Sequence, residues 1–182
     1  MPMGGKITLT DFRILDFIKR KTSCGFMDFM CPKVSFLGNC GLIWLLAAAV
    51  MFAFKSTRTL SLVLVSGLIV GVLICNLLLK NTVARPRPCH LLPESARIRI
   101  PKDYSFPSGH TMSSFIAASI LAEANFWMGV IAIVLAALIG FSRLYLYVHF
   151  PSDVVIGAVL GTLSGIMVWH AALMPELSFI FK

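Results

Sequence analysis

The segment from Ser142 to Asp153 contains the residue types of a nucleophile and its supporting carboxylate. Asp153 follows His149 after four positions, and Arg143 precedes both. A carboxylate that accepts the Nδ1–H of an imidazole leaves Nε2 unprotonated and able to act as a nucleophile or a base. We therefore predict that His149 does this chemistry and that Asp153 orients it. A surface ion pair between Arg143 and Asp153 is the alternative interpretation.

The segment from Phe106 to His110 directly precedes an apolar run and has the pattern of a helix start. Ser108 suits an N-cap, and Gly109 lets a ligand approach the backbone closely. The first N–H groups of a helix and its partial positive charge favour a bound anion, towards which His110 would project. The alternative is an ordinary capped helix whose histidine is hydrogen-bonded.

Basic residues follow the second apolar run, at Lys80, Arg85 and Arg87. Each arginine precedes a proline, which disfavours the α-helical conformation and predicts an extended chain. The planar fork of N–H donors on arginine matches the oxygens of a phosphate. These side chains could instead extend to lipid headgroups at the membrane surface.

Two histidines, one aspartate and at least three cationic side chains thus lie in three separate segments. If the fold brings them together, they form a phosphate cradle with a nucleophile and a second histidine as proton donor. The long loop between the second and third apolar runs holds two carboxylates, Glu94 and Asp103, without a second carboxylate beside either. Because such isolated carboxylates do not suit a divalent ion, we predict no metal and no cofactor.

The composition indicates a membrane protein. Apolar residues make up 58% of the 182 positions and charged residues 13%, and the mean hydropathy is +0.87. A soluble domain carries about twice that charged fraction.

The length suits one domain over residues 1–182. The net charge of +8 is expected to meet phosphate in headgroups or substrate rather than nucleic acid, because no basic patch is interleaved with aromatic residues.

Five apolar runs predict an all-α, polytopic membrane bundle over residues 34–174, with about five transmembrane helices. Two runs of 21 uncharged residues, 34–54 and 59–79, are each about 30 Å long as helices, which is one hydrocarbon thickness. The other predicted spans are 108–122, 126–141 and 154–174. An active-site loop, 80–106, would then lie on the same side of the membrane as the segment 143–153.

Residues 1–33 have apolar and charged side chains at roughly helical amphipathic spacing. This pattern predicts an interfacial helix lying on the membrane, or equally a helix packed on the bundle.

The motifs resemble those of the type 2 phosphatidic acid phosphatase family of integral-membrane lipid phosphatases. All 11 fixed positions of the three family patterns are present: K-x6-RP at Lys80, Arg87 and Pro88, PSGH at 107–110, and SR-x5-H-x3-D at Ser142, Arg143, His149 and Asp153. The family usually has six spans, and this chain has the pattern of five. Residues 1–33 carry no family motif.

The resemblance implies a metal-independent hydrolase that forms a phosphohistidine at His149. It implies that Asp153 orients this residue and that His110 protonates the leaving oxygen and then activates water. The phosphoryl oxygens would be held by Lys80, Arg87, Ser108, Gly109 and Arg143. Arg85 lies two residues outside the family register and is not expected to contact phosphate.

The resemblance leaves the substrate open among undecaprenyl diphosphate, phosphatidylglycerophosphate and phosphatidic acid. We predict undecaprenyl diphosphate, because small bacterial family members recycle it. A contact of Arg97 and Arg99 with the headgroup or distal phosphate is a hypothesis, and a surface hairpin or loop edge is the favoured interpretation of that segment. A lipid phosphotransferase, and a non-enzymatic transporter or scaffold, are alternatives. The oligomeric state has no signal in the sequence.

The membrane orientation rests on conflicting indications. All but three of the lysines and arginines (Lys55, Arg58 and Lys182) would lie on the catalytic side, which by the positive-inside rule places the site in the cytoplasm. The family implies the extracytoplasmic face of the cell membrane, and we follow the family.

Overall fold

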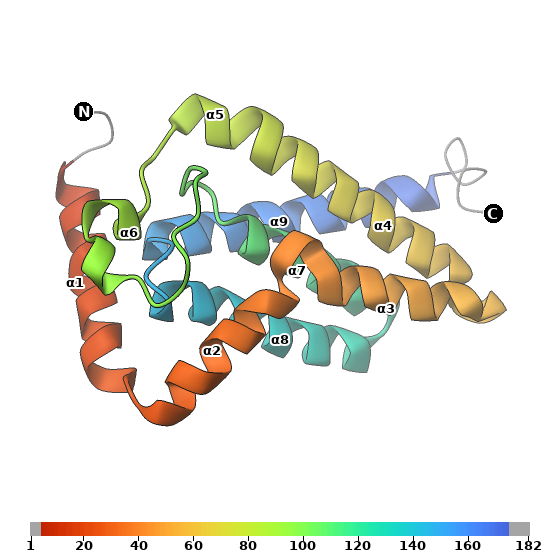
Figure 1. Cartoon of the computed structure of the whole chain (residues 1–182). Helices are drawn as coiled ribbons and strands as arrows, with labels where there is room; N and C mark the ends of the chain where they lie inside the picture. The colour runs from red at the N-terminus through yellow and green to blue at the C-terminus, as the bar shows by residue number, and fades with distance from the viewer. Residues whose placement is uncertain (1–4, 175–182) are drawn as a thin grey trace.

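The computed structural model describes residues 5–174, and this part of the chain is helical, with no strand (Figure 1). The predicted all-α class is confirmed. The ends of the predicted domain, 1–4 and 175–182, including Lys182, lie outside the described residues. The longer helices are α1 (Gly5–Thr22), α2 (Gly25–Leu37), α3 (Leu42–Ala53), α4 (Arg58–Val72), α7 (Gly109–Ala124), α8 (Phe126–Tyr145) and α9 (Pro151–Leu173). The shorter ones are the π-helix η3 (Leu73–Leu79), α5 (Lys80–Val83), α6 (Pro88–Leu91) and three 3-10 turns, η1 (Asn39–Gly41), η2 (Lys55–Thr57) and η4 (Pro93–Ser95).

Within residues 5–174, three helices are long and apolar enough to cross a membrane: Lys55–Leu91, α8 and α9. They contain the predicted spans 59–79 and 126–141 and all but the last residue of 154–174. Helices α2 and α3 meet the same criteria only as a bent pair. Helix α7 has 16 residues and packs against α4, α8 and α9. By length and composition the number of spans is three or four, so the total of five stays a prediction.

The start of α7 lies beside the start of α9 because α9 presents glycines to α7. A Cβ atom at Gly161 would lie 2.5 Å from the carbonyl oxygen of Met112, and one at Gly157 would lie 2.9 Å from that of Ser108. Small residues let two helix backbones approach closely in a membrane bundle. The backbone N–H of Ser108 donates to the carbonyl of Asp153 at 3.1 Å. This packing therefore brings the second and third motif segments together.

The predicted uninterrupted span 34–54 is wrong. The chain bends by 53° between α2 and α3, where Cys40 and Gly41 have positive φ angles of 51° and 68°. The bend also places Gly38 against α7, since a Cβ atom there would lie 2.8 Å from Cδ2 of His110. The break therefore makes room for a histidine that the sequence had already singled out.

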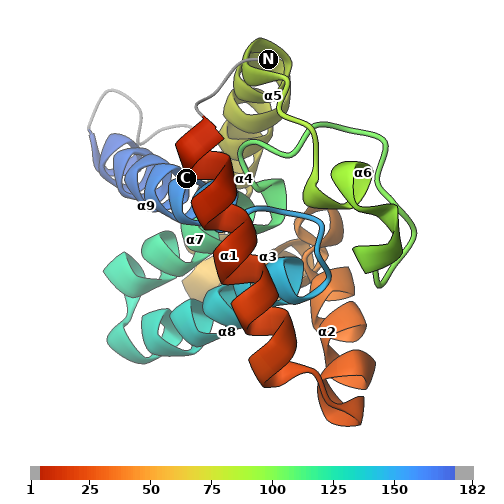
Figure 2. The ribbon, with the colours of Figure 1, turned by 90° about the vertical axis from the view of Figure 1, so that its left-hand side faces the viewer.

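The predicted amphipathic segment 1–33 forms two helices, and α1 lies across the end of the bundle (Figure 2). Leu15 of α1 is fully buried in a cluster with Tyr147 and Phe150. On the other side, Leu9 and Phe17 are exposed. The helix thus packs on the bundle through one face and exposes apolar side chains on another, and its position on the membrane surface stays a prediction.

Candidate active site

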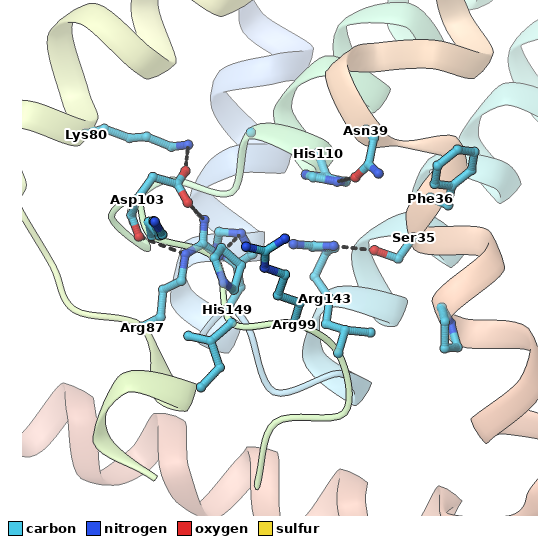
Figure 3. Close-up of a pocket in the computed structure, with 16 residues that line it drawn as sticks. Ser35, Phe36, Asn39, Lys80, Arg87, Arg99, Asp103, His110, Arg143 and His149 are labelled. Atoms are coloured by element: carbon cyan, nitrogen blue, oxygen red, sulfur yellow. Dashed lines mark hydrogen bonds and ion pairs between the residues drawn. The ribbon is translucent and has the colours of Figure 1, made fainter. Parts of the chain in front are cut away.

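One cavity of about 540 Å³ collects most of the predicted site residues. It lies between α2, the segment 98–103 and the start of α7, and Figure 3 shows the labelled side chains around it. Six of the eight predicted residues line it: Lys80, Arg87, Gly109, His110, Arg143 and His149. The other two, Ser108 and Asp153, are fully buried and do not line the cavity.

His149 lies in the short connection between α8 and α9 and is almost completely buried. Its Nε2 atom is 2.9 Å from Nη1 of Arg87. Burial, followed by the charges of Arg87 and Arg143, lowers the pKa of His149 well below its ordinary value of 6.5. The imidazole is therefore neutral at neutral pH, the state that a nitrogen nucleophile requires.

Asp153 lies behind His149 in the first turn of α9. Its Oδ2 atom is 3.7 Å from Nδ1 of His149, which is an ion-pair distance and longer than a hydrogen bond. Within residues 5–174, that Nδ1 has no hydrogen-bond partner. The carboxylate instead accepts from Ser105 Oγ and from the backbone N–H of Phe150. The structure places the predicted pair side by side, without the predicted hydrogen bond.

Arg85 binds Asp153 on the side that faces away from the cavity. Its guanidinium donates to Oδ1 of Asp153 at 2.7 Å and to Oδ2 of Asp11, in α1, at 2.6 Å. All three side chains are buried. Arg85 does not line the cavity. The alternative interpretation of the sequence paired Asp153 with Arg143, whereas in the structure Asp153 pairs with Arg85. Asp11 was missed, although its place one turn before the buried Leu15 marks the same face of α1.

A carboxylate already binds two of the predicted phosphate ligands. Asp103 accepts from Nζ of Lys80 at 2.5 Å and from Nη2 of Arg87 at 2.8 Å. Partial burial raises the pKa of Asp103, but the hydrogen bond from Lys80 and the charge of Arg87 outweigh it and lower that pKa to about 2. The sequence analysis considered Asp103 only as a metal ligand and missed this contact, because only the fold brings it to Lys80.

His110 is held by a residue from the bend between α2 and α3. Its Nε2 atom is 2.8 Å from Oδ1 of Asn39. Because an amide oxygen only accepts, Nε2 carries the proton in this arrangement. Asn39 was missed, although it lies in Gly38-Asn39-Cys40-Gly41, where two glycines around an asparagine indicate a break in the predicted span.

Arg143 reaches the cavity from the last turn of α8. One of its terminal nitrogens donates to Ser35 Oγ of α2. Its buried Nε has no hydrogen-bond partner in the described part of the chain. An unpaired buried donor that borders a cavity is suited to an anionic ligand.

Ser108 and Gly109 are placed differently from one another. Ser108 occupies the N-cap position of α7, but its hydroxyl accepts from Thr111 Oγ1 rather than capping the helix. Gly109 borders the cavity, as expected for a backbone that a ligand approaches.

Arg97 and Arg99, the two arginines considered for a headgroup contact, also have different positions. Arg97 donates to Asp28, Tyr145 and Ser23, so it ties the loop to α2. Arg99 is exposed and lines the cavity.

Helices long and apolar enough to cross a membrane indicate a membrane protein, its basic cavity is suited to an anion, and comparison with known proteins gives its family. The sequence profile of the PAP2 superfamily matches residues 58–175. The undecaprenyl-diphosphatase of Sulfolobus acidocaldarius is 30% identical over 153 residues, covering 83% of this chain and 71% of that protein. Phosphatidylglycerophosphatase B of Bacillus subtilis is 32% identical over 155 residues, covering 78% and 67%.

The fold is also that of a solved family structure. The crystal structure of a transmembrane PAP2-type phosphatidylglycerolphosphate phosphatase from Bacillus subtilis has a TM-score of 0.76, with 24% identity over 94% of this chain and 90% of that one. The chain belongs to the PAP2 superfamily. Its relatives named phosphatases make it a membrane lipid phosphatase of this family.

Proposed function

We propose that the protein hydrolyses a lipid phosphate or diphosphate without a metal ion, through a phosphohistidine at His149. One observation carries this proposal: the neutral His149 and the second histidine, His110, border the same cavity as the cations Lys80, Arg87 and Arg143. Phosphoryl transfer depends on positioning and on neutralising the phosphoryl oxygens, and fixed cationic side chains can supply both.

In the first step, Nε2 of His149 forms a bond to phosphorus while the bond from phosphorus to the leaving oxygen breaks. His110, as the imidazolium beside the bound anionic phosphate, donates a proton to that oxygen and becomes neutral. Asp153 lies 3.7 Å from Nδ1 of His149, so its carboxylate stabilises the positive charge that the ring acquires. Lys80, Arg87 and Arg143, with the backbone N–H of Gly109, hold the phosphoryl oxygens, and buried Ser108 supports the start of α7.

In the second step, the deprotonated His110 removes a proton from water as the water oxygen attacks phosphorus. The bond between phosphorus and His149 then breaks, which releases inorganic phosphate and regenerates the neutral imidazole of His149 and the imidazolium of His110. A second lipid in place of water would make the protein a phosphotransferase, and product analysis with a labelled donor separates the two reactions.

The substrate that we propose is undecaprenyl diphosphate, which would give undecaprenyl phosphate. A relative named undecaprenyl-diphosphatase that aligns with most of this chain supports this choice. Phosphatidylglycerophosphate is the second candidate, since another relative is named phosphatidylglycerophosphatase B. Phosphatidic acid is the third.

We place the protein in the cell membrane with the site on the extracytoplasmic face. Several cations on the catalytic side have local partners, including Arg85, Arg87 and Arg97, so they report less on topology than free charges would. A cysteine at the exposed Glu94, in a variant with the exposed Cys24 and Cys40 replaced by serine, would react with an impermeant reagent in intact cells. Labelling only after lysis would contradict this orientation.

The function is tested by phosphate release from detergent-solubilised undecaprenyl diphosphate, phosphatidylglycerophosphate and phosphatidic acid. We expect the highest kcat/KM for undecaprenyl diphosphate. Quenching with acid and with base distinguishes the intermediate, because a phosphohistidine is acid-labile and stable to base. No release from any of the three substrates would contradict the proposal.

A further inference from the structure

Asp103 has an arrangement that the proposed reaction does not require. Its two carboxylate oxygens are shared between Lys80 and Arg87, the two cations that we propose for the phosphoryl oxygens. Its backbone carbonyl also accepts from Nε of Arg87 at 3.0 Å. In this structure, an internal anion therefore occupies donors that a substrate phosphate needs.

The carboxylate can leave these donors without disrupting a helix. Asp103 lies in the irregular segment 98–107, and its side chain is 48% exposed, whereas that of Arg87 is 3% exposed. Asp103 is also the one carboxylate among the cavity-lining residues, and it shares the cavity with the cations Arg99, Lys102 and Arg143 in addition to its two partners. A bound phosphate would displace a single half-exposed side chain.

The charge of the incoming group decides how readily it displaces a carboxylate. A phosphodiester headgroup carries one negative charge, as the carboxylate does, so the exchange gains no charge interaction. A terminal phosphate carries a charge of about −1.5 to −2 at neutral pH, so it gains additional attraction from the same cations. A cationic cavity at headgroup level without an internal anion would instead be occupied by the abundant diester lipids of the bilayer.

We propose that Asp103 is a specificity-determining residue that excludes phosphodiester headgroups from the site and admits terminal phosphates. Specificity obtained by penalising the wrong ligand is a general device of binding sites. This inference rests on the proposed function, because it assumes that Lys80 and Arg87 bind the substrate phosphate.

The test measures phosphate release from a lipid phosphate in mixed micelles that contain increasing phosphatidylglycerol, a diester. For the wild type we expect KM to stay nearly constant. For Asp103→Asn we expect diester competition to raise the apparent KM about tenfold, because the penalty against the wrong ligand is gone. Asp103→Glu, which keeps the charge, should retain the exclusion. Glu94→Gln is the matched control, since it removes an exposed carboxylate from the same loop outside the cavity, and it should behave as the wild type.

A binding measurement without turnover separates this inference from the proposed function. Calorimetric titration with inorganic phosphate should show about tenfold tighter binding to Asp103→Asn than to the wild type, since the internal competitor is gone. Weaker phosphate binding together with a KM that phosphatidylglycerol does not change would overturn the inference and make Asp103 a positioning residue for Lys80 and Arg87. If Asp103→Asn does not fold, Asp103→Ser serves the same comparison. Absence of turnover in the wild type would contradict the proposed function and leave the binding result to decide on Asp103.

Discussion

Arg87 Nη1 and His149 Nε2 lie 2.9 Å apart at the buried end of the cavity. The same guanidinium reaches Asp103 through Nη2. A phosphoryl group bound beside these two side chains, with its approach to Nε2 opened by a shift of the guanidinium, would contact the imidazole nitrogen and a phosphate-binding cation at once. We therefore expect substitution of His149 to reduce activity more than substitution of any other residue that lines the cavity.

Substituting His149→Ala should abolish turnover while substrate binding persists, because the cations that hold the phosphoryl group are retained. We expect a loss of kcat by several orders of magnitude, since attack by a side-chain nucleophile is removed. Single-turnover assays with labelled substrate measure this loss, and they should also show no covalent intermediate. His170→Ala, at an exposed position near the far end of α9, should keep wild-type kcat. Residual turnover within tenfold of wild type would contradict the assignment.

The lowered pKa of His149 predicts how stability depends on pH. Between that pKa and 6.5 the unfolded chain binds a proton that the folded protein excludes, so stability is greatest above 6.5 and decreases as the pH falls below it. Thermal unfolding in detergent should show this decrease for the wild type. The decrease should be smaller for His149→Gln, which has no group to titrate. Equal slopes for the two proteins would show that His149 does not carry a lowered pKa.

Asn39 should matter for the proton transfer that we assign to His110. The loss of its amide in Asn39→Ala frees the ring to rotate, so we expect kcat to fall about 10- to 100-fold, part of what a general acid contributes. KM should change little, because Asn39 binds the histidine and not the proposed phosphate ligands. Steady-state kinetics test this separation. Asn81→Ala, at an exposed position in α5, is the control, and an equal effect there would refute a specific role.

Asp11 is expected to stabilise the protein although it lies outside the cavity. Asp11→Ala leaves the buried Arg85 with one carboxylate partner, which should lower the free energy of unfolding by about 1–3 kcal/mol. Arg13→Ala, at an exposed position of the same helix, should change it by less than about 0.5 kcal/mol. Denaturation in detergent compares the two variants. Similar values for both would mean that the ion pair contributes nothing measurable.

Activity should persist after treatment with EDTA, because Lys80, Arg87 and Arg143 are proposed to neutralise the phosphoryl oxygens. Among residues 5–174, no three His, Cys, Asp or Glu side chains gather as a possible metal site. Purified protein assayed with EDTA, and again after addition of Mg²⁺, provides the measurement. A strict requirement for Mg²⁺ would contradict the proposed scheme.

The sequence predicted what depends on local pattern. The runs 126–141 and 154–174 correspond to α8 and α9, and Pro151 begins α9 because proline suits the first turn. The motif positions also predicted site residues, six of which line one cavity. Local pattern is enough for these features because apolar length and helix-start residues are encoded within a few turns.

The missed features depend on contacts between distant segments. The close approach at Gly38 could not be predicted, because the ring that a side chain there would meet belongs to His110, which lies 72 positions later in the chain. Asp11 meets Arg85, and Asp103 meets Lys80, only through packing of α1 and the loop. Such pairs leave no periodic signal in a single sequence.

The break between α2 and α3 and the position of α1 determine how small a working protein can be. The region that matches the family profile begins at residue 58, yet Asp11, Ser35 and Asn39 each bind a side chain of the site from before that point. A protein shortened to the shared region would keep every motif residue, but it would lose the side-chain partners of Arg143 and His110 and the carboxylate of Asp11 that binds Arg85 behind Asp153. The part of the chain that defines membership of the family is therefore smaller than the part that assembles the chemistry.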